Sequence, residues 1–377
     1  MKKGTLSVHA GSTRERYLGG VNSPIVTSSA IEYLDDTEVR YPRYFNTFNQ
    51  QVVAAKLCAL EGAADGIVTS SGMAAISSIM MGLLHPGEHA VVLEGMYGGT
   101  YSLVTTEFRR LGIEFSISSG EPDDIKEKIR PNTRLLFVES PTNPLLSILD
   151  LAAIASIARA KDIVCAIDNT FATPILQNPV EHGFDLVMHS GTKYLGGHSD
   201  LCCGVVVGPV HLMERIRAHA LMHGGSLNAQ ECYLLERSLK TLELRVLRQS
   251  ENALQLASAL EGSNRVAQVH YPGLAAHPRH DVAERQMRAY GGMLSFRVTD
   301  GIDPDAFLRA LDWIPCAVSL GGVETMVCQP VATSHQRMQH EERERLGITP
   351  QLIRVSVGIE NPEDIIEEVL GALDSAA

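Results

Sequence analysis

The sequence predicts an α/β protein in which a large domain built on a mostly parallel sheet is followed by a smaller α+β domain. From about residue 60 to residue 245, short β-rich runs alternate with segments of helical periodicity. Most of these runs are apolar along almost their whole length, which is typical of parallel strands covered by helices on both faces. Towards the C-terminus, strands and helices no longer alternate regularly, which indicates a second domain of the α+β class.

The expected strands of the large domain follow one another with helices between several of them. A helical period covers residues 72–84 and 151–162, and a longer one covers 228–262. After that helix, residues 293–298 and 352–359 are expected to be strands of the smaller domain, which also contains two helical stretches. The strands of the large sheet are expected at residues 66–70, 89–95, 113–118, 134–140, 162–170, 185–190 and 203–208.

The periodicity divides the chain into three parts. Residues 1–47 show weak periodicity and are expected to form an extended arm. The large α/β domain is expected over residues 48–235. The smaller domain is expected over residues 236–377, begun by the long helix that links it to the large domain.

The composition narrows the classes of function. The chain of 377 residues has 44 acidic and 32 basic residues, and its net charge of −12 argues against general affinity for nucleic acid or anionic membranes. No apolar run reaches the roughly 18 residues of a membrane span, and no apolar stretch of a secretory signal follows the first two lysines. The seven cysteines form no Cys-x-x-Cys pair, which is typical of buried, reduced thiols. We therefore expect a cytoplasmic protein with no nucleic acid and no membrane as a partner.

Polar residues follow two of the expected strands. In an open α/β sheet, ligands bind beyond the carboxyl ends of the strands. Ser71, Gly72 and Met73 come after the first strand and open a helix, whose free N–H groups suit a phosphate. An ordinary serine N-cap would give the same pattern. Asn143 follows the fourth strand in a loop between two prolines, and by itself it is typical of a turn.

An acid and a lysine follow two further strands. Asp168 ends a largely apolar run, where a buried carboxylate is costly without a partner, although a helix cap or a surface salt bridge would also explain it. Lys193 follows the next strand, and the hydroxyls of Ser190 and Thr192 beside it can bind an anion. A desolvated lysine can form a Schiff base, whereas a lysine that leaves the sheet for solvent is the plain alternative.

Together these residues predict a site for pyridoxal 5'-phosphate. The lysine stands 25 residues after the acid, and both are expected to face one crevice with the helix start. The cofactor needs an amine for its aldehyde, an acid for its pyridine nitrogen and a polar cradle for its phosphate. The combination is therefore far more specific than any one of its parts.

No metal site is expected. His219 and His223 have the i, i+4 spacing of metal ligands on a helix, and His277 and His280 are also close in sequence. Neither pair has acids or cysteines at ligand spacing. We interpret all four as solvated surface histidines.

The chain resembles the pyridoxal-phosphate enzymes of cysteine and methionine metabolism along nearly its whole length. This family includes cystathionine γ-synthase, cystathionine γ- and β-lyases, methionine γ-lyase and O-acylhomoserine sulfhydrylases. Seven blocks carry the resemblance in the family's order: "SSGMAAI" at 70–76, "MYGGTY" at 96–101, "ESPTNP" at 139–144, "AIDNTFATP" at 166–174, "HSGTKYLGGHSD" at 189–200, "VSLGGVET" at 318–325 and "LIRVSVGIE" at 352–360. The resemblance implies an aspartate-aminotransferase-like large domain of fold type I.

The resemblance implies roles around the cofactor. Lys193 would hold the cofactor and move protons, Asp168 would pair with the pyridine nitrogen, and Tyr97 would stack on the ring and assist proton transfer to the departing group. The phosphate would be bound by the backbone at Gly72 and Met73 and by the hydroxyls of Ser190 and Thr192.

The resemblance also implies a substrate site. Asn143 would lie near the cofactor's phenolic oxygen and the substrate carboxylate. Arg354 would bind that carboxylate as a bidentate pair, the geometry in which a guanidinium excels. Ser319 would sit in the same pocket, and the substrate would be a small amino acid.

The arm has its own implied role. "YPRYFNTF" at 41–48 is similar to the family's tyrosine-x-arginine segment, so Tyr41 and Arg43 would reach a neighbouring subunit's phosphate. This implies a homo-oligomer, a dimer with shared active sites within a tetramer. The family commonly shows asparagine-proline-threonine next, whereas this chain has Asn46, Thr47 and Phe48, which puts the shape of the substrate entrance in question.

The implied reaction cleaves or forms a C–S bond at the γ- or β-carbon of a sulfur amino acid or an activated homoserine, as in a cystathionine γ-synthase or γ-lyase. An O-acylhomoserine sulfhydrylase or a methionine γ-lyase is the alternative. Gly99 stands where methionine γ-lyases typically have cysteine, and Val318 where cystathionine enzymes often have glutamate, so these two clues disagree. A catalytically silent, cofactor-binding regulatory homologue is the alternative from another class, and the intact Lys193, Tyr97 and Arg354 argue against it.

Overall fold

The computed structural model describes residues 1–14, 19–35, 37–336 and 338–377, so residues 15–18 and 36 of the expected arm lie outside the described residues. Two units emerge. Unit 1 comprises residues 1–94, 102–139 and 151–243, and unit 2 comprises residues 95–101, 140–150 and 244–377. The expected domain ranges 1–47, 48–235 and 236–377 stay predictions.

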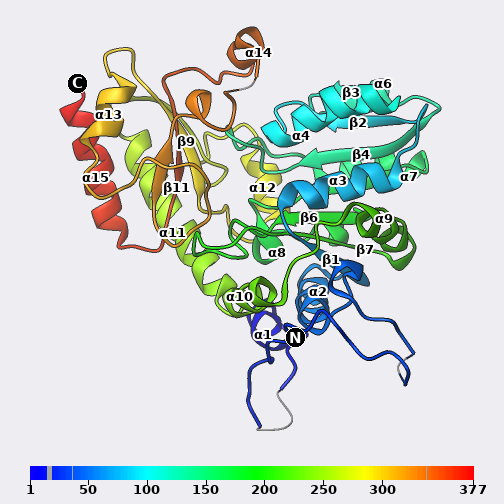
Figure 1. The fold of residues 1–377 in the computed structure, drawn as a ribbon. Coiled ribbons are helices and arrows are strands. Elements are labelled where there is room, and N and C mark those ends of the chain that lie inside the picture. The colour runs from blue at the N-terminus through cyan, green and yellow to red at the C-terminus, as the bar shows by residue number, and fades with distance from the viewer. Residues whose placement is uncertain (15–18, 36, 337) are drawn as a thin grey trace. The chain divides into compact units, whose positions relative to one another are not determined.

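Unit 1 contains the large sheet, and its strands confirm the expected ones to within a few residues (Figure 1). The strand order is β1-β7-β6-β5-β4-β2-β3. Neighbours from β6 to β3 pair in parallel, and β7 runs antiparallel to both β6 and β1. The strands are β1 Asp65–Thr69, β2 His89–Leu93, β3 Glu114–Ser118, β4 Thr133–Glu139, β5 Val164–Asp168, β6 Leu186–Ser190 and β7 Gly204–Gly208.

The strands β2 and β7 are buried at every position, and β4, β5 and β6 over most of their length. Because successive side chains of a strand point to opposite faces, such runs require cover on both faces of the sheet. The helical segments of unit 1 are α1 Lys3–His9, η1 Pro42–Tyr44, α2 Phe48–Glu61, α3 Gly72–Leu83, η2 Leu103–Phe108, α5 Arg109–Leu111, α6 Pro122–Lys128, α7 Leu151–Ala160, α8 Thr173–Leu176, η3 Pro179–His182, α9 Val210–His223 and α10 Ala229–Leu239.

Unit 2 contains a smaller, antiparallel sheet in the order β10-β11-β9-β8, which agrees with the expected α+β class. Its strands are β8 Val266–His270, β9 Met293–Val298, β10 Met326–Cys328 and β11 Leu352–Ser356. Its helical segments are α4 Gly98–Ser102 (whose last residue belongs to unit 1), α11 Leu242–Glu261 (which begins in unit 1), α12 His280–Gln286, α13 Pro304–Ala310, η4 Pro330–Ala332, α14 His340–Arg345 and α15 Pro362–Ser375.

The long helix expected over 228–262 is two helices, α10 and α11, interrupted at Lys240 and Thr241. The backbone N–H groups of both residues bond to carbonyls three residues back, at Arg237 and Ser238, which tightens the turn and ends the α-helical ladder. The Thr241 hydroxyl also donates to Ser238 O, at 3.2 Å. The single-helix expectation is therefore wrong at this point.

Two expectations from composition can be compared with the structure. All seven cysteines are free thiols, but Cys202 and Cys316 are exposed, so the expectation that the thiols are buried is wrong for these two. Among the described residues, no helix combines the length and apolar character needed to cross a membrane.

Candidate active site

The start of α3 lies directly against the end of β6. A Cβ added at Gly72 would lie 2.9 Å from Cβ of Ser190, so only glycine allows this close approach. The Ser71 hydroxyl accepts from Ala74 N at 3.1 Å and caps the helix. The N–H groups of Gly72 and Met73 donate no hydrogen bond to any other residue that the structure describes. Two free donors at a helix N-terminus beside a serine hydroxyl form an anion cradle.

Asp168 ends β5 and is 8% exposed. Its Oδ1 atom accepts from the backbone N–H of Thr170 at 3.0 Å and from the Thr170 hydroxyl. Burial raises the pKa of Asp168 above its ordinary value, and the Thr170 hydrogen bonds and the charge of His189 oppose this rise only in part. Its Oδ2 atom has no hydrogen-bond partner among the described residues, so it can accept from a ligand.

Thr170 also joins the acid to the anion cradle. Its hydroxyl accepts from the backbone N–H of Ser190 at 2.8 Å while donating to Asp168. The ends of β5 and β6 are therefore tied together by one side chain. Sequence reasoning gave Thr170 no role, although its place two residues after the strand-ending acid is a signal that could have identified it.

Lys193 lies in a series of tight turns after β6. Its backbone N–H donates to Ser190 O at 3.2 Å, and its carbonyl accepts from Gly197 at 2.7 Å. The Thr192 hydroxyl donates to Cys203 O at 3.2 Å and accepts from Cys203 N at 3.1 Å. These bonds fix the turn that presents the half-buried Lys193 beside Ser190, and they occupy the Thr192 proton that was expected to bind phosphate.

Unit 2 brings together three other predicted residues. Arg354, in β11, is 4% exposed. Its Nη1 atom donates to Asn143 Oδ1 at 3.0 Å, and its Nη2 atom donates to Ser319 O at 2.9 Å. Its Nε atom is buried without a hydrogen-bond partner among the described residues. An arginine held by two acceptors, with N–H donors still to spare, can bind a carboxylate.

The two acceptors around Arg354 are positioned by the backbone. Ser319 has a φ of 83°, a left-handed conformation that is uncommon for residues other than glycine and that directs its carbonyl to Arg354. The loop with Asn143 is held by β9, because the Ser295 hydroxyl donates to Pro144 O at 2.7 Å. Ser295 pairs with Arg354 across the sheet, so one strand pair positions both the guanidinium and the loop.

His335 is a residue of this site that sequence reasoning missed. It is fully buried, its Nδ1 atom lies 2.9 Å from the Ser334 hydroxyl, and its Nε2 atom has no hydrogen-bond partner among the described residues. Burial and the nearby positive charge of Arg354 lower its pKa to about 4, so the ring is neutral near neutral pH. No motif in the sequence marks this position.

The remaining predicted residues are exposed. Tyr97 precedes α4 in unit 2 and is 43% exposed. Tyr41 and Arg43 lie in the arm, where Arg43 donates to Leu221 O and lies 5.2 Å from the ring centre of Tyr44. The expected role of Tyr41 and Arg43 towards another subunit's phosphate stays a prediction.

The expected surface histidines differ from the structure at one position. His277 is buried, and burial lowers its pKa, so the surface interpretation is wrong for it. His219 and His223 stack with ring centres 4.0 Å apart, and His280 Nδ1 lies 2.8 Å from Pro272 O. Among the described residues, no group of three or more histidine, cysteine or acidic side chains could hold a metal ion.

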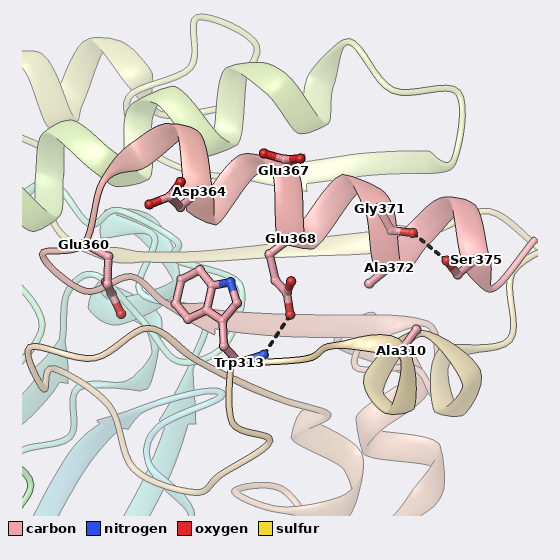
Figure 2. A pocket seen from close by; sticks show the side chains of 9 residues that line it. All are labelled: Ala310, Trp313, Glu360, Asp364, Glu367, Glu368, Gly371, Ala372 and Ser375. Atoms are coloured by element: carbon pink, nitrogen blue, oxygen red, sulfur yellow. Dashed lines mark hydrogen bonds between the residues drawn. The ribbon is translucent and has the colours of Figure 1, made fainter.

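An acidic pocket in unit 2 is a structural feature rather than part of this site. It has a volume of about 590 Å³ and lies along α15, with the ring of Trp313 against it (Figure 2). Glu368 accepts from Trp313 N at 3.1 Å, and Glu360 accepts from the backbone and hydroxyl of Thr325 at 2.6 and 2.8 Å. These acids therefore hold the neighbouring backbone.

Comparison with known proteins decides the family. The model of the family described as Cys/Met metabolism PLP-dependent enzyme matches residues 4–374. The chain belongs to this family. It is a pyridoxal-phosphate-dependent enzyme that cleaves or forms C–S bonds in sulfur amino-acid metabolism.

The relatives and solved structures match over nearly their whole length. Cystathionine gamma-lyase of Bacillus subtilis is 40% identical over 100% of both chains. Cystathionine beta-lyase of Coxiella burnetii is 40% identical over 98% of this chain and 97% of its own. The crystal structure of cystathionine gamma-lyase from Lactobacillus plantarum complexed with L-serine has a TM-score of 0.96 at 34% identity and covers 100% of this chain and 99% of that chain. The aspartate-aminotransferase-like, fold type I expectation is confirmed.

The residues of unit 1 fit pyridoxal phosphate. The cradle at Gly72 offers two free N–H donors for a phosphate. The open Oδ2 atom of Asp168 suits a protonated pyridine nitrogen, and Lys193 supplies a primary amine in the turn that begins at Ser190.

Proposed function

We propose that this enzyme is a lyase that cleaves cystathionine at its γ-carbon. The observation that carries the proposal is the carboxylate-binding arrangement of Arg354, Asn143 and Ser319 in unit 2. The 40% identity to a cystathionine gamma-lyase over both complete chains supports this reaction. Cleavage consumes one water and yields cysteine, 2-oxobutyrate and ammonia.

Unit 1 holds the cofactor in this proposal. Its phosphate would rest on the N–H groups of Gly72 and Met73 and on the hydroxyl of Ser190, and Asp168 would accept from the pyridine nitrogen. The Thr192 hydroxyl, which is bonded to Cys203, would fix the turn beside the phosphate instead of binding it. Bound pyridoxal phosphate supplies an electron sink for bonds broken at the substrate α-carbon. Lys193 holds the cofactor covalently through its amine.

The amine of Lys193 would also move protons at the substrate. This amine would remove the proton from the substrate α-carbon and later return a proton to the carbon chain of the product. The turn after β6 keeps Lys193 half-buried. Tyr97 stacks on the cofactor ring and delivers a proton to the departing sulfur.

Unit 2 holds the substrate's α-carboxylate. Arg354 is already oriented by Asn143 and by the Ser319 carbonyl, so little side-chain freedom is lost when the substrate binds. Asn143 lies within reach of both the carboxylate and the cofactor's phenolic oxygen in this proposal. The neutral His335 leaves Arg354 as the cation for the carboxylate, since a second positive charge there would be disfavoured by Arg354 itself.

Cleavage of cystathionine at the β-carbon is the second candidate, favoured by the 40% identity to a cystathionine beta-lyase. Val318 bears on this choice because it stands beside Ser319 and is 69% exposed, which offers an apolar surface to a substrate chain. Gly99 leaves the position near Tyr97 without a thiol. Neither residue supplies a charge for the distal amino group of cystathionine.

One assay separates these reactions. The purified enzyme is incubated with cystathionine, cysteine, methionine, and O-acetyl- or O-succinylhomoserine with thiols, and the products are identified. We expect 2-oxobutyrate and cysteine from cystathionine. Pyruvate and homocysteine would establish β-cleavage instead. A thioether from the acyl esters would make the enzyme a synthase or sulfhydrylase, and 2-oxobutyrate from methionine alone would make it a methionine γ-lyase.

We further propose a cytoplasmic homotetramer built from dimers with shared active sites. Seven free thiols support a reducing compartment. The arm supports a partner subunit, because Tyr33, Leu34 and Val39 expose apolar side chains in the same arm as the predicted phosphate ligands Tyr41 and Arg43.

Mixed oligomers test the shared site. Lys193→Ala and Arg43→Ala variants, each inactive or strongly impaired alone, are co-expressed and the mixed oligomer is isolated. A dimer of one subunit of each kind keeps one complete site, so activity well above that of either parent is expected. Equal inactivity of the mixed oligomer would contradict a site completed by the partner's arm, and light scattering would measure the number of subunits.

A further inference from the structure

The loop of residues 318–325 carries the Ser319 carbonyl that orients Arg354, and it has an uncommon backbone. Ser319 and Gly321 are both left-handed, with φ of 83° and 77°. A left-handed serine is unfavourable and persists only where the surrounding structure enforces it. The loop must therefore be held by contacts beyond its hydrogen bond with Arg354.

Ser356 holds this loop from the strand that also carries Arg354. The two residues stand two positions apart in β11, so their side chains lie on the same face of the sheet. Arg354 Nη2 donates to Ser319 O at 2.9 Å, and the backbone N–H of Gly321 donates to Ser356 Oγ at 2.8 Å. Ser356 is buried, so water does not compete for this hydrogen bond. One strand therefore binds the loop at two neighbouring points.

Gln249 holds the loop from a second element, the helix α11. Its side chain is fully buried, and its Nε2 atom donates to Gly322 O at 2.7 Å and to Val357 O at 3.1 Å. The amide therefore joins the loop to the residue that follows β11. Because both acceptors are carbonyls, only the NH2 group fits between them, and Oε1 stays buried without a hydrogen-bond partner among the described residues. The two bonds thus fix the amide in one orientation.

Asn252 is an amide of the same helix that serves for comparison. It is buried, and its Nδ2 atom donates to Gly358 O at 3.0 Å and to Glu360 O at 2.8 Å. Both acceptors belong to the segment that follows β11, so these bonds fasten that segment to α11. Gln249 differs because one of its two acceptors lies in the loop of residues 318–325. Its placement therefore points to the orientation of the loop and not only to the stability of unit 2.

We propose that Ser356 and Gln249 are positioning residues for the substrate's α-carboxylate. They hold the loop with the Ser319 carbonyl, this carbonyl orients the Arg354 guanidinium, and the guanidinium binds the carboxylate. Neither residue touches the substrate in this arrangement. Two parallel N–H groups match a carboxylate only when the plane of the guanidinium is fixed, so a loosened loop weakens the binding of carboxylates more than that of neutral groups. The inference rests on the proposed role of Arg354.

The test compares two ligands that differ only at the carboxylate. The dissociation constants of L-alanine and of L-alaninamide, in which a neutral amide replaces the carboxylate, are measured by titration of the holoenzyme. Neither ligand carries a leaving group, so neither undergoes the proposed cleavage. The quantity of interest is the ratio of the two constants, because a general loss of structure weakens both ligands alike.

We expect the preference of the wild type for the carboxylate to fall about tenfold in Ser356→Ala, which removes the acceptor for Gly321. Gln249→Met keeps the length of the side chain and removes both donors. It is expected to show a fall of similar size, which keeps the test decisive if the Ser356 variant does not fold. Ser356→Thr keeps the hydroxyl and should restore most of the preference. The dissociation constant of pyridoxal phosphate should stay within about twofold of the wild type in all three variants.

Two control variants remove matched hydrogen bonds that do not reach the loop. Ser250→Ala removes a buried hydroxyl that donates to Val246 O within α11, and Asn252→Leu removes the amide that bonds only Gly358 and Glu360 among the described residues. Both should keep the ratio of the wild type. An unchanged ratio in the folded Ser356→Ala and Gln249→Met variants would overturn the inference, and so would an equal fall in the controls.

Arg354→Lys separates that result from a failure of the proposed site. If Arg354→Lys abolishes the preference for the carboxylate and the Ser356 and Gln249 variants keep it, Ser356 and Gln249 only stabilise the fold. If Arg354→Lys also keeps the preference, the proposed role of Arg354 is wrong, and the inference fails with it.

Discussion

The cofactor residues of unit 1 and the carboxylate residues of unit 2 are built in different ways. In unit 1, Asp168 and Ser190 stand at the carboxyl ends of adjacent parallel strands, and Thr170 joins them. In unit 2, Arg354 lies within an antiparallel strand, and its acceptors come from loops at positions 143 and 319.

This difference separates what the topology fixes from what the loops decide. Parallel strands bring their carboxyl ends to one edge of the sheet, so the spacing between Asp168 and Ser190 is set by backbone hydrogen bonds. The orientation of Arg354 depends instead on the left-handed backbone of Ser319 and on the loop that Ser295 holds. We infer that the cofactor half tolerates little change, whereas the substrate half can be altered by changes in its loops.

The largest effect is expected from removing the reactive amine of Lys193 in unit 1. Lys193→Ala should lower kcat by more than about three orders of magnitude, because the variant loses both the covalent attachment and the proton-transferring group. The fold should persist, as measured by circular dichroism, since the side chain ends a turn held by backbone bonds. Lys161→Ala, at an exposed lysine after α7, is the control, and unchanged turnover in Lys193→Ala would refute the assignment.

The next largest effect is expected from a substitution in unit 2 alone. Arg354→Lys keeps the charge but loses the planar fork that bonds Asn143 and Ser319, so KM for the amino-acid substrate should rise about 100-fold. The dissociation constant of pyridoxal phosphate should stay within about twofold of the wild type. Arg309→Lys, at an exposed arginine of α13, serves as the control. If KM stays constant, or if the affinity for the cofactor falls by the same factor, Arg354 does not bind the substrate carboxylate independently of the cofactor-binding residues of unit 1.

These two sites also show how far the sequence alone could go. The strands of the large sheet were predictable because apolar runs and β-branched residues mark them locally, and Asp168 and Lys193 were predictable because they follow such runs. The break at Lys240 and Thr241 was not, because it contains no glycine or proline and arises from bonds to the preceding turn. The helical pattern of apolar and polar residues runs through Lys240 and Thr241 without a break, so the sequence does not mark the interruption.

The missed residues have a common physical cause. Ser356 stands at the end of an apolar strand and Gln249 in an amphipathic helix, so each by itself is indistinguishable from a core or a surface residue. Their relation depends on the hydrogen bonds that both make to one loop, at Gly321 and Gly322. His335 likewise acquires its meaning only from its proximity to Arg354. Contacts of this kind come from tertiary packing, which periodicity does not encode.

A smaller effect sharpens the comparison within unit 1. Thr170→Val keeps the shape of the side chain but removes the donor to Asp168 and the acceptor for Ser190, so the dissociation constant of the cofactor should rise about tenfold. Thr170→Ser restores the hydroxyl and should recover most of the affinity. KM at saturating cofactor should change by less than about twofold. Equal affinities of the valine and serine variants would show that the hydroxyl bridge is unimportant.

The smallest expected effect concerns the titration of one buried histidine in each unit and its influence on stability. Burial lowers the pKa of His89 in unit 1 and of His335 in unit 2 to about 4, from an ordinary value near 6.5. Between these values the unfolded chain binds a proton that the folded chain does not, so the free energy of unfolding falls as pH decreases. Each histidine should lower the free energy of unfolding by about 1 kcal/mol between pH 6.5 and pH 5.5, as measured by urea unfolding at the two pH values.

His89→Gln and His335→Gln should each flatten this dependence by a similar amount, because each removes one such proton. They should differ in catalysis, since His335 lies near Arg354 whereas His89 bonds only to Thr133 and Ser116 among the described residues. We expect His335→Gln to raise KM several-fold and His89→Gln to leave it unchanged. An identical KM in both variants would show that His335 is a structural residue and does not contribute to substrate binding. The carboxylate site would then consist of Arg354, Asn143 and Ser319 alone.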